Sequence, residues 1–287
     1  MRTTSHIATS TLFVLTAATA FAGESNKITA ATRNQCMKTL RDGLSTDQFW
    51  PSMHAAEALT LTGCGDEVRT VLKPKLPTVE NPQHRCGVAR ELFRAGDASA
   101  IGVLWEVLAS EDPYGHGHAC ESLFKIKQIG DGVLLKQHMN DETSPIKQLL
   151  AAAALARHGD AEAQQSIHNY LIGDDDNMAR LAAWTMAVSG DDSDIAALRK
   201  RAQSITDPRH KVYFHAALAT FGDEAGSTAL QADLNHEEST VRVYAAEFCG
   251  HAKLATAIPA LTKLLHDEDL DVRIRAAQAL CMLGKSM

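Results

Sequence analysis

Eight pairs of small residues recur along the chain at nearly regular spacing. The intervals between successive pairs are 33, 31, 33, 30, 34, 29 and 31 residues. The pairs are Ala55-Ala56, Val88-Ala89, Ala119-Cys120, Ala152-Ala153, Ala182-Ala183, Ala216-Ala217, Ala245-Ala246 and Ala276-Ala277. Each pair lies in a segment whose apolar residues have helical spacing, as in DVRIRAAQALCML. Such a period with two helices per unit predicts an α-solenoid, in which each repeat packs on its neighbours.

Gly-Asp dipeptides separate most of these units. Glycine can adopt the left-handed conformation that ends one helix, and aspartate can cap the start of the next. The dipeptides begin at Gly65, Gly96, Gly130, Gly159, Gly190 and Gly222. A second, shorter helical segment lies between units, most clearly at residues 257–267. We therefore predict an all-α, right-handed superhelix of about eight helical hairpins over residues 33–287, without a sheet.

Composition narrows the functional classes. The 28 Lys and Arg residues face 35 Asp and Glu residues, so the net charge is −7. A nucleic-acid binder needs a basic stripe, which this acidic balance argues against. Aromatic residues make up only 5% of the chain, so its core must consist mainly of Ala, Leu, Ile and Val.

The first 22 residues have the pattern of a signal peptide. Arg2 precedes an apolar run at residues 7–22, which ends with Ala20 and Ala22 at the −3 and −1 positions of a cleavage site. An uncleaved membrane anchor is the alternative. Residues 23–32 would form a flexible mature N-terminus. No later stretch is apolar enough to span a membrane, so we expect a periplasmic or secreted protein that is not membrane-embedded.

The last two units carry a recognisable sequence pattern. Val-Arg-x-x-Ala-Ala occurs at residues 241–246 and again at residues 272–277, followed by Phe248 in the first copy and Leu280 in the second. This pattern resembles HEAT repeats, particularly the short type of the phycobilisome lyases, from about residue 33 onward. The resemblance implies that the Ala-Ala helices line a concave face. An exported chain does not fit the cytoplasmic bilin-lyase function. The final helix ends the chain without a polar capping helix, so its apolar flank is either exposed or paired.

Repeats one and three share an unusual polar pattern on one helix face. An aromatic residue is followed after four positions by His and then after three by Glu, which places all three on one side of a helix. The two copies are Trp50, His54 and Glu57, and Tyr114, His118 and Glu121. Repeat two adds Arg85 and Arg90, and His116 precedes the third set in a glycine-rich segment. Repeats four and five carry Ala and Leu instead, so we predict a ligand site across repeats one to three.

Three interpretations of this polar strip remain open. It is a solvated helix face, a ligand groove, or a metal site. In a groove, Trp50 and Tyr114 would stack on sugar rings while the charged residues bind hydroxyls, carboxylates or sulfates. The predicted function is a binding module or scaffold for a protein or an anionic glycan, with no cofactor.

The alternative function is a lyase or hydrolase acting on an acidic polysaccharide. His118 and Glu121 would then serve as base and acid, with His54 and Glu57 as a second candidate pair. Arg85 and Arg90 would neutralise the charge of the substrate. No complete catalytic motif of another class is present in the sequence.

A metal site is the minor alternative. One HEAT-repeat family, deoxyhypusine hydroxylase, holds two irons with His-Glu dipeptides, whereas the strip histidines here stand in His-x-x-Glu order. Helices two repeats apart lie roughly 16–20 Å apart, and metal ligands need about 2.0–2.2 Å. His54 and His118 therefore cannot share an ion in a regular solenoid. We predict no metal site, although a set within one repeat (His116, His118 and Glu121) would leave a metal-dependent enzyme possible.

The six cysteines fit an oxidising compartment but match no zinc motif. Cys36 and Cys64 belong to one predicted hairpin at the end of the solenoid, and we predict that they form a disulfide. The other four, Cys86, Cys120, Cys249 and Cys281, lie within predicted inner helices. Those helices are usually too far apart for a bridge, so buried thiols are expected there.

Overall fold

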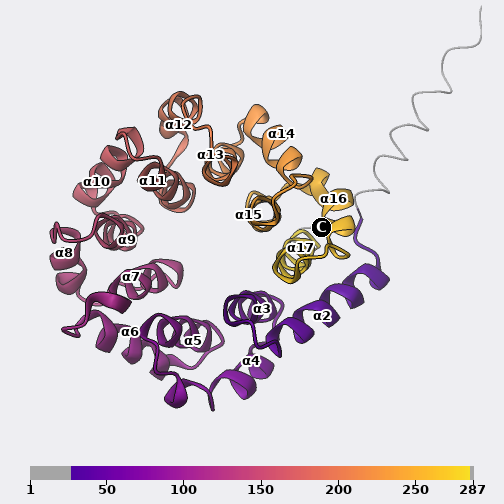
Figure 1. The fold of residues 1–287 in the computed structure, drawn as a ribbon, viewed down its shortest axis with the longest axis horizontal. Helices are drawn as coiled ribbons and strands as arrows, with labels where there is room; N and C mark the ends of the chain where they lie inside the picture. Colours follow the sequence, from indigo (N-terminus) through magenta and orange to yellow (C-terminus); the bar gives the residue numbers. More distant parts are fainter. Residues whose placement is uncertain (1–26, 285–287) are drawn as a thin grey trace, which may run out of the picture.

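The computed structural model describes residues 27–284, which form sixteen α-helices and no strand (Figure 1). The helices alternate between an inner and an outer layer, and so make the eight predicted hairpins. The inner helices are α3 (Phe49–Leu61), α5 (Pro82–Arg94), α7 (His116–Lys125), α9 (Pro145–Ala156), α11 (Asp176–Ser189), α13 (Pro208–Thr220), α15 (Ser239–His251) and α17 (Leu270–Leu283). The all-α solenoid is confirmed. The predicted signal peptide lies outside the described residues.

The outer helices are shorter on average and surround the inner ones (Figure 1). They are α2 (Ala30–Leu44), α4 (Gly65–Leu72), α6 (Ile101–Leu108), α8 (Val133–Met139), α10 (Ala161–Ile172), α12 (Ile195–Ala202), α14 (Glu224–Asp233) and α16 (Ile258–Leu264). Five 3₁₀ turns lie in the connections, at Leu76–Thr78, Ala98–Ala100, Pro113–Gly115, Asp192–Asp194 and Ala255–Ala257. Helix α2 begins at Ala30, inside the segment predicted to be flexible, because the Thr29 hydroxyl caps it by accepting from the Thr32 N–H.

Each predicted small-residue pair lies inside an inner helix and is at most 3% exposed. Small side chains allow the inner helices to approach closely. At Gly250 in α15 there is no room even for a methyl group, since a Cβ there would lie 2.8 Å from the Cα of Ala279 in α17. The alanine-rich pattern is therefore a packing requirement of the inner layer.

The Gly-Asp boundaries are confirmed in part. Gly159 has φ 89°, and the next residue, Asp160, accepts a backbone N–H from the first turn of α10. Left-handed glycines also occur at Gly96, Gly130 and Gly222. Two predicted positions are wrong: Gly65 is the first residue of α4, because Gly63 (φ 91°) makes the turn. Gly190 has φ −88°, and the chain turns instead through a capping box formed by the aspartates that follow.

The solenoid closes into a ring, which the sequence analysis did not predict. Helix α17 packs against both α2 and α3, so the last repeat contacts the first (Figure 1). We call this contact between α17 and the α2–α3 pair the seam. It buries the apolar flank of the final helix, where Ile274, Ala277 and Leu280 are fully buried. Of the two outcomes that the sequence left open, this flank is paired.

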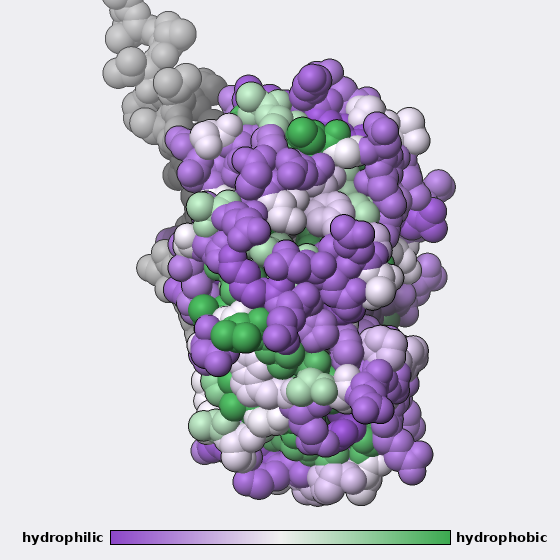
Figure 2. All heavy atoms as spheres, turned by 90° about the vertical axis from the view of Figure 1, so that its left-hand side faces the viewer, coloured by the Kyte–Doolittle hydropathy of each residue, from purple (hydrophilic) through white to green (hydrophobic). Residues whose placement is uncertain are grey.

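The outer surface is polar. Figure 2 shows the side of the ring that carries α8 and α10, where hydrophilic residues predominate and apolar ones are scattered. Val133 and Ile172 are among the few large apolar side chains that are well exposed, at 57% and 58%. Within residues 27–284, none of the helices has the length and apolar character needed to span a bilayer.

The tight seam leads to a stability prediction. A Cβ at Gly43 in α2 would lie 2.7 Å from Cδ1 of Ile274 and 3.1 Å from Cβ of Ala55. We expect Gly43→Val to lower the free energy of unfolding by about 1–3 kcal/mol through overpacking, as measured by urea denaturation. The matched control is Gly102→Val in α6, where a Cβ meets nothing within 4 Å, with an expected change within about 0.5 kcal/mol. Equal effects of the two substitutions would contradict the importance of the seam.

Candidate functional site

The centre of the ring holds a cavity of about 680 Å³, which we call the central cavity. All eight inner helices contribute to its lining, mostly from their N-terminal halves. One residue from each helix in turn is Trp50, Arg90, His118, Leu150, Arg180, Tyr213, Tyr244 and Arg275. Ring closure brings all eight repeats around one space, so the cavity extends beyond repeats one to three, and a ligand site within these three stays a prediction.

A smaller cavity of about 270 Å³, the opposite cavity, lies toward the C-terminal ends of the same helices. Arg94, Arg157 and His251 line it. The two cavities share four lining residues, namely Lys125, Trp184, Glu247 and Phe248. Every inner helix thus lines the central cavity, and all of them except α17 also reach the opposite one, in or just after their C-terminal halves.

Aromatic side chains provide flat surfaces in the central cavity. Trp50 stacks on His118, with ring centroids 5.3 Å apart and an interplanar angle of 16°. Tyr114 is 55% exposed. On the other side of the cavity, the Arg180 guanidinium lies 5.0 Å from the centroid of the Tyr213 ring. Repeats one and three do bring Trp50, Tyr114 and His118 together, as the sequence pattern indicated.

His54 takes part in a contact that crosses the seam. Its Nδ1 lies 2.7 Å from Oδ1 of Asp271 in α17. Burial raises the pKa of the Asp271 carboxyl, but His54 and Arg275 lower it below its usual value, so this group is an ionised acceptor and Nδ1 carries the proton. Burial, reinforced by Arg275, lowers the pKa of His54 despite Asp271. His54 is therefore neutral near pH 7, with the lone pair on Nε2.

His118 and Glu121, which were predicted as a base and an acid, also line the central cavity. His118 Nδ1 lies 3.6 Å from Oε2 of Glu121, whose other oxygen is 2.9 Å from Lys125 Nζ. Burial raises the pKa of Glu121, but Lys125 and Arg90 lower it, to about 2. Burial lowers the pKa of His118. At neutral pH, Glu121 is thus ionised and has no proton to donate.

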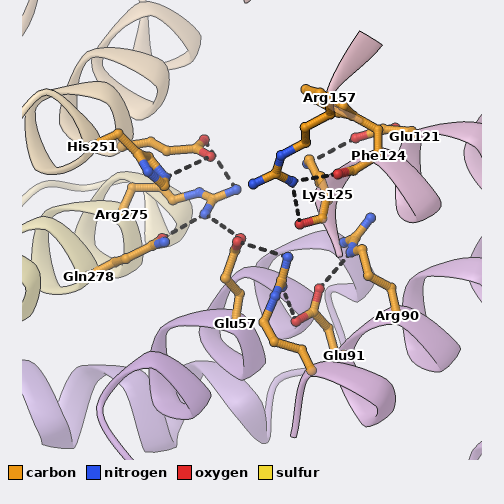
Figure 3. Close-up of polar contacts among 12 residues, drawn as sticks. Glu57, Arg90, Glu91, Glu121, Phe124, Lys125, Arg157, His251, Arg275 and Gln278 are labelled. Carbon is orange, nitrogen blue, oxygen red and sulfur yellow. Dashed lines mark hydrogen bonds and ion pairs between the residues drawn. The ribbon is translucent and has the colours of Figure 1, made fainter. Parts of the chain in front are cut away.

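Glu57 belongs to a network of ion pairs that joins four inner helices, α3, α5, α15 and α17 (Figure 3). Arg275 places one nitrogen 3.1 Å from Glu57 and another 3.2 Å from Glu247, and it is only 2% exposed. Arg94 approaches Glu57 from α5 at 3.2 Å. We call Glu57, Arg94, Glu247 and Arg275 the ion-pair belt. Although Glu57 lies three residues from His54, it lines the opposite cavity rather than the central one.

Two arginines that line the cavities have no carboxylate partner among the described residues. Arg157 donates to the backbone carbonyls of Phe124 and Lys125 at 2.6 and 3.2 Å, and it points toward the space beside the ion-pair belt (Figure 3). Arg180 donates to the side-chain oxygen of Asn177 at 2.9 Å. The central cavity therefore contains one cation, Arg180, that its own carboxylates leave unpaired.

Two predicted site residues lie away from the central cavity. Arg85 points to Glu106 on the outer helix α6, at 3.3 Å. His116 is 7% exposed, and its Nε2 lies 3.0 Å from the carbonyl oxygen of Ser110. The glycine-rich segment around His116 thus holds its imidazole inside a turn, where this side chain supports the start of α7. Arg90 does reach the cavity, although it is nearly buried and bonds to Glu91 at 2.7 Å.

The structure does not form the predicted disulfide between Cys36 and Cys64. Within residues 27–284 no disulfide joins any of the cysteines. The Cys36 side chain hydrogen-bonds to that of Cys281 across the seam. Cys64 instead contacts the side chains of Arg41 and Glu67. Ring closure, which gave Cys36 a neighbour from the other end of the chain, is the reason for the difference.

The described residues contain no group of three or more His, Cys, Asp or Glu arranged to hold a metal ion. One His-Glu dipeptide does occur in the chain, His236-Glu237, in the turn before α15. There His236 Nδ1 accepts the backbone N–H of Glu238 at 3.1 Å, so the imidazole serves the turn.

Comparison with known proteins agrees with this architecture. Residues 195–281, which span α12 to α17, match the family model of HEAT repeats. This part of the chain is therefore similar to HEAT repeats. No curated protein sequence matches the chain.

Two solved structures resemble the ring weakly. Human deoxyhypusine hydroxylase in complex with glycerol has 18% sequence identity and a TM-score of 0.43, over 94% of this chain and 99% of that one. An engineered protein has 20% identity and a TM-score of 0.31, over 93% of this chain and 84% of that one.

Several lining residues escaped the sequence analysis. Arg180, Tyr213 and Arg275 belong to repeats that the polar strip left out, and Asp271 belongs to the last. Glu247 repeats the acidic position of the strip, and Tyr244, three residues before it, stands where the strip has its histidine, so this partial copy was a usable signal. The other lining residues could be predicted only with the knowledge that the last repeat packs against the first and closes the ring.

The ion-pair belt yields a direct test. Arg275→Met leaves Glu57 and Glu247 facing each other in a buried space, so we expect a loss of about 3–5 kcal/mol in the free energy of unfolding. Arg273→Met, two residues earlier, is the control. Arg273 donates only to the backbone carbonyls of Asp267 and Glu268, and its loss should cost about 1 kcal/mol. Urea denaturation measures both, and a loss below 1 kcal/mol for Arg275→Met would argue against the belt.

Proposed function

We propose that this protein is a binding module that holds a small anionic glycan in its central cavity. The observation that carries the proposal is Arg180, a cation in the cavity lining without a carboxylate partner among the described residues. Beside it lie the flat faces of Tyr213 and Tyr244, and across the cavity lies Trp50. A guanidinium binds a carboxylate or sulfate in a fork geometry, and aromatic faces pack on sugar rings.

The shape of the site supports a small ligand over a folded protein. The eight inner helices surround the central cavity, so a partner must enter at a mouth of the ring and cannot lie along an open concave face (Figure 1). A volume of about 680 Å³ is within the usual range of about 300–1,000 Å³ for small-molecule pockets. We therefore favour a glycan of a few residues among the partners expected from the sequence.

The charges of the cavity support an anionic ligand. Each of the other three cations in the lining has a carboxylate neighbour: Arg90 has Glu91, Lys125 has Glu121, and Arg275 has Glu57 and Glu247. In these ion pairs the carboxylates neutralise the charge of the three cations. An anionic group on the ligand would complete the remaining pair at Arg180, in a partly buried place where such a pair is less screened by salt.

We also propose that the protein is exported to the periplasm or secreted. The support is the signal-peptide pattern of residues 1–22. Extracellular and periplasmic spaces expose a protein to acidic polysaccharides and their fragments, which fits the proposed ligand class.

Calorimetric titration with uronic-acid oligosaccharides tests the binding proposal. We expect Arg180→Gln to weaken binding by tenfold or more, the usual effect of losing a charged hydrogen bond, and to abolish the preference for acidic over neutral oligosaccharides. Arg199→Gln on the outer helix α12 is the control and should bind like the wild type. No binding of any acidic oligosaccharide by the wild-type protein, or equal binding by Arg180→Gln, would refute the proposal.

A second candidate function, a polysaccharide lyase, is favoured by the contact between His54 and Asp271. A neutral histidine held by a carboxylate through Nδ1 can act as a general base at Nε2. In an elimination on a uronide, Nε2 would take the proton from C5, the C4–O bond would break, and a C4=C5 double bond would form. The departing oxygen keeps the electron pair and takes up a proton.

The test follows the appearance of the unsaturated product by its ultraviolet absorbance. Because His54 must be neutral, the rate should rise as the pH rises through its pKa, which lies below 6.5. His54→Gln should lower kcat by at least a hundredfold. His215→Gln is the matched control, since His215 Nδ1 lies 2.7 Å from Asp233 in a pair of similar burial that does not line the central cavity. Absence of product with every acidic polysaccharide would leave the binding module as the function.

A further inference from the structure

The first and last helices of the described chain bring two thiols together. Helix α2 carries Cys36, which is fully buried, and α17 carries Cys281, which is 6% exposed. Their side chains are in hydrogen-bond contact although 245 positions separate them in the sequence. No other described contact between cysteine side chains crosses the seam.

Contacts on either side fix this pairing. A Cβ at Gly43 would touch Ile274, and Arg33 donates to the carbonyl oxygen of Gly284 at 3.4 Å. Cys36 lies seven residues before Gly43 and three residues after Arg33. Cys281 lies seven residues after Ile274 and three residues before Gly284, so the intervals on the two helices match. The two helices therefore run antiparallel in one continuous register, in which Cys36 stands opposite Cys281.

The close approach of the two helices at Gly43 favours the geometry of a disulfide. A bridge needs Cα atoms within about 7 Å, which ordinary helix spacings of about 8–10 Å rarely provide. Here a glycine in α2 removes the side chain that would hold the helices apart, and Ile274 occupies its space. The wide helix spacing that usually prevents a disulfide between packed helices is thus reduced at the seam.

We propose that Cys36 and Cys281 form a disulfide that closes the ring covalently. The two thiols lose two protons and two electrons as the S–S bond forms. The oxidant is a disulfide, either that of a thiol–disulfide oxidoreductase or of a small molecule such as oxidised glutathione, which is reduced to two thiols. Formation in the cell depends on the proposed export, whereas the reaction of the purified protein does not.

The closed seam itself limits when this bond forms. Its contact with Cys281 and its burial raise the pKa of the Cys36 thiol, and the thiolate is the form that attacks a disulfide. Oxidation is therefore slow in the closed ring and proceeds when the seam opens or before it first closes. The resulting bond would hold α17 in place, and with it Asp271 and Arg275, which line the central cavity.

Peptide mapping of the purified full-length protein tests the proposal. The reduced protein is incubated with oxidised glutathione, its remaining thiols are alkylated in denaturant, and it is digested without reductant. We expect the peptide of Cys36 to be joined to that of Cys281, with Cys64 and Cys249 alkylated. Alkylation of both Cys36 and Cys281, or a link from Cys36 to Cys64, would overturn the proposal.

A melting experiment provides the second measurement. Reductant should lower the melting temperature of the oxidised wild type by about 10 °C, because the bond closes a very long loop of the unfolded chain. The Cys36→Ala/Cys281→Ala variant should show no response to reductant, while the control Cys249→Ala should respond like the wild type. If reductant leaves the melting temperature of the oxidised wild type unchanged, the disulfide does not stabilise the ring. This measurement does not depend on the folding of any variant.

Discussion

The packing of α17 against α2 and α3 is the contact on which the rest of the architecture depends. An open solenoid would expose the apolar flank of its last helix, which packs here against the first repeat, with Ile274 fully buried beside Gly43. The same contact places Asp271 beside His54 and Arg275 beside Glu57. Without the seam, the central cavity would lose one of its eight walls and both of these polar contacts. Fold and site thus share a single requirement, which is that the curvature of eight repeats amounts to one full turn.

Charge organisation follows from that closure. A buried arginine is tolerable when carboxylates surround it, and Arg275 has one on either side, from helices that are far apart in the sequence. The belt therefore works as a check on correct assembly, because a ring that closed in another register would separate Arg275 from Glu57. Arg180 differs from this pattern. It lies on the cavity side, with an amide oxygen and an aromatic ring as its neighbours, so its charge remains available to a ligand.

The sequence specified the repeat architecture well because the pattern is local. The Ala-Ala pairs mark the inner helices correctly, since close packing between adjacent repeats demands small side chains wherever it occurs. The site was predicted only in part. Trp50, Tyr114 and His118 converge as their periodicity indicated, because they lie on helices near each other in the chain. Partners that cross the seam, such as Asp271 for His54 and Cys281 for Cys36, leave no trace in local periodicity. The sequence spacing also did not predict the direction of some side chains. Arg85 and His116 turn toward Glu106 and Ser110 and not toward the central cavity.

Closure also constrains how such a protein can change over evolutionary time. Open repeat proteins gain or lose whole repeats easily, because each unit contacts only its neighbours and the ends are independent. In this chain each repeat turns the backbone by an eighth of a circle, so a ninth would overshoot and a seventh would leave a gap. Duplication or deletion of a repeat, which merely lengthens or shortens other solenoids, would here separate α17 from α2 and dismantle the cavity as well. The number of repeats has become a fixed property of the fold, and variation is confined to the residues that each repeat presents.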